Sequence, residues 1–125
     1  MTDEEKQTLY DRVDDAISKL ISELPDELRQ KAEKIPCLLD GFSPLESHPK
    51  AIGQYYSVEE RAVDCLGQYR AYGGEDGVIF IYIEAILKAE GGNLDTTCQS
   101  ARQVYLHELG HALNLGELEL DERGL

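Results

Sequence analysis

The segment His107-Glu108-Leu109-Gly110-His111 has the form H-E-x-x-H and combines residue types that bind and use a metal ion. Residues i and i+4 differ by about 40° around a helix, so both imidazoles project from one side, about one turn apart. Two ring nitrogens placed that way can each reach one zinc ion at about 2.0 to 2.1 Å. Glu108 lies about 100° round the helix from His107, beside the metal rather than on it. We therefore expect a zinc site in which Glu108 is the general base.

A catalytic zinc site needs a third protein ligand and an open fourth position. The motif helix is expected to stop at Asn114, because Asn tolerates the left-handed conformation that ends helices and lets the chain turn back. Glu117 is then the preferred third ligand. Glu119 and Asp121 in the same acidic segment are alternatives, and His48 is a rival from a distant loop. The alternative for Glu117 itself is a solvated carboxylate in an acidic tail.

The motif must be held by a long helix that starts within residues 94–97, with Asp95 or Thr96 as its N-cap, and runs to about Leu113. A projection at about 100° per residue separates two faces. The face toward the expected cleft holds Ser100, Gln103, Val104, His107 and His111. The opposite face, expected to pack on a sheet, holds Ala101, Tyr105, Leu109 and Ala112. Cys98 lies about 180° from His107 and cannot join the same metal ion.

The remaining elements follow from hydrophobic spacing and turn residues. Apolar residues at steps of three and four predict an amphipathic helix over 2–24, and Pro25 begins a shorter helix reaching about Lys34. Strands are expected at 37–39, 66–72 and 78–83, the last two joined as a hairpin, with a short helix at 84–90 and a loop at 42–57. The 78–83 strand is a candidate edge for pairing with an extended substrate.

Composition favours one domain spanning residues 1–125. The net charge of −13 disfavours nucleic acid and anionic membranes as partners. The opening residues lack a signal-peptide pattern, and no apolar stretch would span a bilayer, so a soluble, cytoplasmic protein is expected. Three scattered cysteines indicate reduced thiols that pack as small hydrophobes. The tyrosines at 69, 72 and 82 are expected in the core or on strand surfaces rather than as oxyanion donors.

The motif with Asn114 and Glu117 resembles the zincin metallopeptidases, one branch of which has the pattern H-E-x-x-H-x-x-G-x-x-D/E with the acid as third ligand. More narrowly, the chain is similar to the minimal zincins, a family of small bacterial zincin-like zinc metallopeptidases. The likeness covers most of the chain after about Leu20, but only the metal motif is highly specific. Asn114 stands where the family has glycine. The resemblance implies an α+β fold, with a small twisted β-sheet packed against an N-terminal helix and a C-terminal active-site helix.

The leading functional hypothesis is a cytoplasmic zinc metallopeptidase that hydrolyses peptides or proteins. Zn²⁺ on His107, His111 and Glu117 would activate water, and Glu108 would take its proton and pass it to the leaving amine. One alternative is a zinc-binding domain that interacts with a protein or peptide with little or no turnover, or that needs a partner to complete its site. Another is a metal-free acidic protein in which the motif is accidental.

Overall fold

The structure, a computed structural model, describes residues 2–41, 66–70 and 77–113. These residues form four helices and a small three-stranded mixed sheet, so the predicted α+β class is confirmed. The elements in chain order are α1 (Asp3–Glu23), α2 (Asp26–Glu33), β1 (Cys37–Asp40), β2 (Gly67–Arg70), β3 (Val78–Tyr82), α5 (Ile83–Ala89) and α6 (Leu94–Ala112). The predicted loop at 42–57 lies outside the described residues.

The sheet has the strand order β1-β3-β2. β1 runs parallel to β3, with Cys37 opposite Ile79, and β2 runs antiparallel to β3, with Gly67 opposite Ile81. The antiparallel pairing expected of the last two strands is therefore confirmed. The expectation that the 78–83 strand offers an edge is wrong, because β3 lies in the middle and its backbone groups already pair on both sides.

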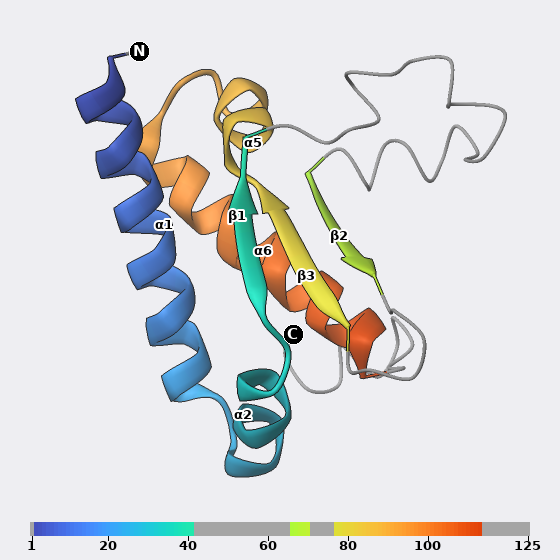
Figure 1. The fold of residues 1–125 in the computed structure, drawn as a ribbon. Coiled ribbons are helices and arrows are strands. Elements are labelled where there is room, and N and C mark those ends of the chain that lie inside the picture. Colours follow the sequence, from blue (N-terminus) through green and yellow to red (C-terminus); the bar gives the residue numbers. More distant parts are fainter. Residues whose placement is uncertain (1, 42–65, 71–76, 114–125) are drawn as a thin grey trace, which may run out of the picture.

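α1 forms because its apolar residues fall on one stripe and because Thr2 caps its first turn, accepting a hydrogen bond from the Glu5 backbone N–H at 3.1 Å. The stripe is buried at every turn, by Leu9, Val13, Ile17 and Leu20. Figure 1 shows α1 alongside β1 and α6 behind the strands. No helix in the described ranges is long and apolar enough to cross a membrane.

α6 supplies one wall of the hydrophobic core. Ala101, Tyr105 and Leu109 are fully buried, and they belong to one cluster with Ile79 and Ile81 of β3. The predicted inward face of this helix is confirmed, with Ala112 partly buried at its end. Burial of this face fixes the rotation of α6 about its axis. It therefore also fixes where the opposite face, with its two histidines, must point.

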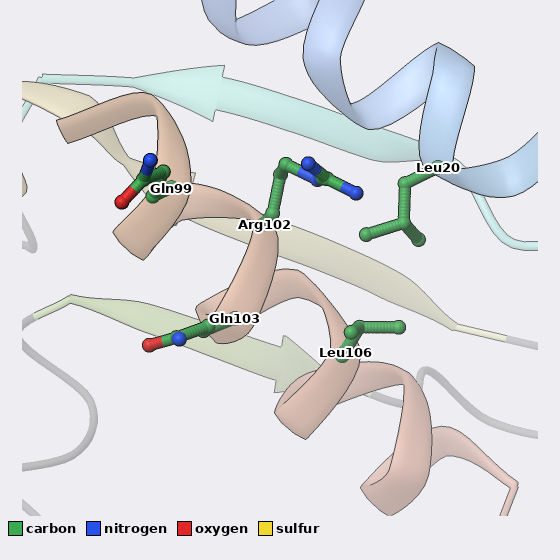
Figure 2. A pocket seen from close by; sticks show the side chains of 5 residues that line it. All are labelled: Leu20, Gln99, Arg102, Gln103 and Leu106. Carbon is green, nitrogen blue, oxygen red and sulfur yellow. The ribbon is translucent and has the colours of Figure 1, made fainter. Parts of the chain in front are cut away.

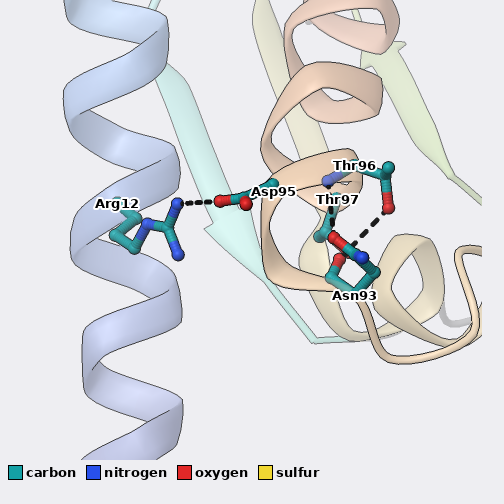
Figure 3. Close-up of polar contacts among 5 residues, drawn as sticks. All are labelled: Arg12, Asn93, Asp95, Thr96 and Thr97. Carbon is teal, nitrogen blue, oxygen red and sulfur yellow. Dashed lines mark hydrogen bonds and ion pairs between the residues drawn. The ribbon is translucent and has the colours of Figure 1, made fainter.

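The N-cap of α6 is Asn93, so the prediction of Asp95 or Thr96 is wrong (Figure 3). The Asn93 side-chain oxygen accepts a hydrogen bond from the Thr96 backbone N–H at 3.0 Å, and its carbonyl oxygen accepts one from the Thr97 hydroxyl at 2.6 Å. Asp95 instead accepts a hydrogen bond from Arg12 of α1 at 2.6 Å. The ion pair joins α1 to α6, and the cap residue Asn93 lies two positions before Asp95.

Candidate metal centre

The two histidine rings converge on the outer side of α6. The Nε2 atoms of His107 and His111 are 3.0 Å apart, with ring centroids at 4.6 Å and ring planes at 86°. His107 is partly buried and His111 is exposed. The i, i+4 spacing predicts this convergence, and the geometry confirms it.

The separation of the two nitrogens fits a shared metal ion. Two zinc–nitrogen bonds of about 2.0 to 2.1 Å at a tetrahedral angle hold their nitrogens about 3.3 to 3.4 Å apart, a few tenths of an ångström more than the 3.0 Å observed. A small rotation of either ring closes that difference. Without a metal, the same separation suits a hydrogen bond in which one Nε2–H donates to the other Nε2. Metal binding requires deprotonated nitrogens, so an ion would replace that proton.

Glu108 completes the group, because its carboxylate and the two imidazoles offer ligand atoms that all lie within 4.8 Å of one another. The Glu108 side chain is 3% exposed, which is rare for a carboxylate. The helical projection places it only beside the histidines and does not predict this burial. The buried acid therefore lies next to two imidazoles with which it could hold a metal ion.

Glu108 owes its position to a close approach of α6 to β2. A methyl group at Gly67 would overlap the Val104 side chain, and it would lie 3.1 Å from the Phe80 carbonyl oxygen and 3.6 Å from Glu108 Cγ. The lack of a side chain at Gly67 therefore allows this side of α6 to pack closely against β2. Nothing in the local sequence around the motif signals the contact, since Gly67 and the motif are far apart along the chain.

The other residues of the predicted cleft face have separate roles. Gln103 is exposed, while Val104 is partly buried against the core beside Gly67. The Ser100 hydroxyl donates a hydrogen bond to Glu90 at 2.5 Å. The predicted face is therefore partly a packing surface, and within it His107 and His111 are the residues that could hold a metal ion.

The cysteines and tyrosines within the described residues belong to the packing, as predicted. Cys37 and Cys98 are free and partly buried against the core, and burial raises the pKa of the Cys37 thiol to about 12. Tyr82 is 2% exposed and donates a hydrogen bond to the Gln68 side chain at 3.3 Å. Tyr69 is partly buried against the core.

The other candidate ligands lie outside the described residues. These are Glu117, Glu119, Asp121 and His48; the turn residue Asn114 also falls there, as do Tyr72 and Cys65. The choice of third ligand therefore stays a prediction from the sequence.

Comparison with known proteins adds no assignment: no protein-family model matches the chain, and no curated protein matches its sequence. The resemblance to zincins therefore stays a prediction from the sequence. The case for a function is carried by the geometry of His107, Glu108 and His111.

Proposed function

We propose that this chain is a zinc-dependent metallopeptidase of the zincin type, in which His107 and His111 hold the metal and Glu108 is the general base. The observation that carries the proposal is the convergence of the two Nε2 atoms, 3.0 Å apart, beside a buried carboxylate. Glu117 is the proposed third ligand, from its place in the sequence after the motif. When bound, zinc supplies Lewis-acid activation of a water molecule and of the substrate carbonyl.

In this proposal the Glu108 carboxylate moves one proton twice. It accepts a proton from the attacking water as the new carbon–oxygen bond forms, and it delivers that proton to the amine nitrogen as the carbon–nitrogen bond breaks. Water is consumed and the carboxylate is regenerated.

Two measurements test the metal site. Protein purified without added zinc and without nickel chromatography is expected to carry about one zinc per chain, measured by elemental analysis. His107→Ala and His111→Ala should each lose that zinc. His48→Ala tests the rival third ligand and should keep the zinc if Glu117 is the third ligand. Glu117→Ala should weaken zinc binding, and Glu119→Ala should not. If the parent protein is purified without zinc and does not bind added zinc, the proposed metal site is wrong.

Glu108→Gln tests the base. The glutamine side chain keeps the shape of glutamate but cannot accept the proton. Zinc should therefore remain bound, while cleavage of a mixed peptide library should fall by about 10²- to 10⁴-fold. Glu23→Gln, at an exposed position on α1, is the charge-matched control and should cleave like the parent. If the Glu108→Gln protein holds zinc and cleaves as fast as the parent, the assignment is wrong.

The second candidate function is a zinc-binding domain that holds a peptide or protein partner without cleaving it. The burial of Glu108 favours it, since a carboxylate with 3% exposure also fits a purely structural role beside the metal. The same peptide library separates the two functions. Cleavage that a chelator abolishes identifies the enzyme, and zinc-dependent retention of intact peptides identifies the binding domain.

A further inference from the structure

The face of the sheet turned away from α6 carries an arginine that its neighbours hold in place. Arg70 of β2 donates a hydrogen bond from Nε to Oε1 of Gln68 at 2.9 Å, and its guanidinium carbon lies 5.8 Å from the centre of the Phe80 ring. These three side chains share one face, because side chains alternate along each strand and Gln68 lies opposite Phe80. The other face holds Ile79 and Ile81, which pack with α6 behind the strands in Figure 1.

The side chains that hold Arg70 are themselves fixed. Gln68 is 7% exposed, and its Oε1 also accepts a hydrogen bond from the Tyr82 hydroxyl at 3.3 Å. The rings of Phe80 and Tyr82 are nearly parallel, at 8°, with centroids 6.3 Å apart. A guanidinium that is bonded at Nε and lies over an aromatic ring loses less freedom on binding a ligand than an unattached surface arginine does.

Arg70 keeps donors for a ligand. A guanidinium has five N–H groups, and Gln68 accepts from the one on Nε. Among the described residues Arg70 forms no ion pair, although the chain has 25 acidic residues. The one acid within the three strands, Asp40, lies opposite Tyr82, whereas Arg70 lies opposite Val78. These two positions are four residues apart on β3, about 13 Å, which is too far for an ion pair.

Apolar surface adjoins this guanidinium. Leu38 of β1 lies opposite Phe80 on the same face and is 50% exposed, and Phe80 itself is partly exposed. Leu38 and Gln68 lie on the two strands that flank Phe80, so their backbones are about 10 Å apart. A ligand of that size could reach both the arginine and the leucine.

Arg102 of α6 provides a contrast within the same protein. It is exposed, lines a pocket of about 350 Å³ between α1 and α6, and forms no ion pair among the described residues. Figure 2 shows it extending toward Leu20 and away from Gln99 and Gln103. No carboxamide of that pocket therefore holds this guanidinium as Gln68 holds the one on β2.

We propose that Arg70, held by Gln68 over the Phe80 ring, binds an organic carboxylate with a short apolar body, either a free acid or the C-terminus of a peptide. Nη1 and Nη2 of Arg70 donate to the two carboxylate oxygens. Leu38 and the edge of Phe80 contact the apolar body. The metal-binding helix packs on the opposite face of the sheet, so this site requires neither the metal nor the peptidase function proposed above.

Two probes of similar shape test the recognition of charge. Hexanoate is charged at neutral pH and hexanamide is not, and each is titrated into the full chain and followed by NMR. The net charge of −13 repels hexanoate, so without this site hexanamide should bind at least as well. The parent should instead bind hexanoate about fivefold more tightly at low salt. Hexanoate should also shift the side-chain amide resonances of Gln68.

Variants assign the preference to one arginine. Arg70→Gln should abolish the preference for hexanoate over hexanamide, and Arg70→Lys should retain part of it. Arg102→Gln, the matched control, removes one positive charge elsewhere and should leave the preference intact. Circular dichroism checks that each variant is folded, and the comparison of the two probes in the parent needs no variant.

Three further probes define the class of ligand. Acetate and inorganic phosphate should both bind more weakly than hexanoate, because neither has an apolar body. N-acetyl-leucine represents a peptide C-terminus, and the tighter of N-acetyl-leucine and hexanoate identifies the source of the carboxylate. Equal binding of hexanoate and hexanamide by the parent overturns the proposal. So does a preference that survives Arg70→Gln, or phosphate that binds as tightly as hexanoate.

Discussion

Replacing Gly67 with alanine tests whether the α6–β2 contact is as close as the structure shows. Two effects oppose one another. Alanine in a strand gains about 0.5 to 1 kcal/mol over glycine through the unfolded chain. The new methyl group, however, overlaps the Val104 side chain and lies 3.1 Å from the Phe80 carbonyl oxygen, and overpacking of this kind costs about 1 to 3 kcal/mol. The second effect should win, and Gly67→Ala should be destabilised by about 1 to 2 kcal/mol.

A double-mutant cycle with Val104→Ala makes this reasoning refutable. Removing the Val104 methyl groups relieves the overlap, so the double variant should be more stable than the sum of the two single effects by about 1 kcal/mol. Urea unfolding followed by circular dichroism measures all four proteins. If Gly67→Ala is at least as stable as the parent, or if Val104→Ala adds its full cost in its presence, the two elements are not in the contact described.

Gly67→Ala should also affect Glu108 more than it affects the two histidines. Glu108 Cγ would lie 3.6 Å from the new methyl group, whereas His107 and His111 lie toward the outer side of the helix. A shift of α6 away from β2 should therefore lower peptide cleavage more than zinc affinity. Cleavage rates and zinc titrations of Gly67→Ala compare the two directly. A loss of zinc affinity that is as large as the loss of cleavage would contradict this arrangement.

Two further predictions concern buried groups of the core. The Cys37 thiol has its pKa raised by burial to about 12, against about 8.5 to 9 when unfolded. Above pH 9 the unfolded chain loses this proton and the folded chain keeps it, so the free energy of unfolding should fall by about 1.4 kcal/mol for each pH unit. Urea unfolding midpoints measured over this pH range should fall less steeply for Cys37→Val than for the parent. The buried Tyr105 hydroxyl has no hydrogen-bond partner within the described residues. Tyr105→Phe should therefore stabilise the protein by about 1 kcal/mol, as measured by thermal unfolding. A loss of stability would show instead that the hydroxyl does make a hydrogen bond.

Features governed by one helical period could be predicted from the sequence. The burial of Tyr105 and Leu109 and the convergence of His107 and His111 all follow from the positions of these residues on a single helix. The antiparallel strand pair also followed from local patterns. These features need no knowledge of what packs against them. The α+β class was an expectation from the resemblance to the minimal zincins, and the structure confirms it.

Features that depend on a distant partner could not be predicted. Glu108 lies where α6 approaches β2, and the bare backbone of Gly67, in another element, leaves room there for the Val104 side chain. Asn93 and Asp95 are both good capping residues, and the choice between them goes with the ion pair that Arg12 of α1 makes with Asp95. The central position of β3 depends on its parallel pairing with β1, and parallel pairing leaves no turn signature in the sequence.

The position of β3 has a consequence for how the chain acquires its structure. Within residues 2–41, 66–70 and 77–113, the two outer strands precede β3 in the chain and do not pair with each other. Neither therefore has a strand partner in this part of the chain until residues 78–82 have been synthesised. Among the described residues, a nascent chain that ends before this point lacks the central strand and most of the core that covers the apolar stripe of α1. This three-stranded sheet can therefore form only after β3 has been synthesised, in the latter part of translation.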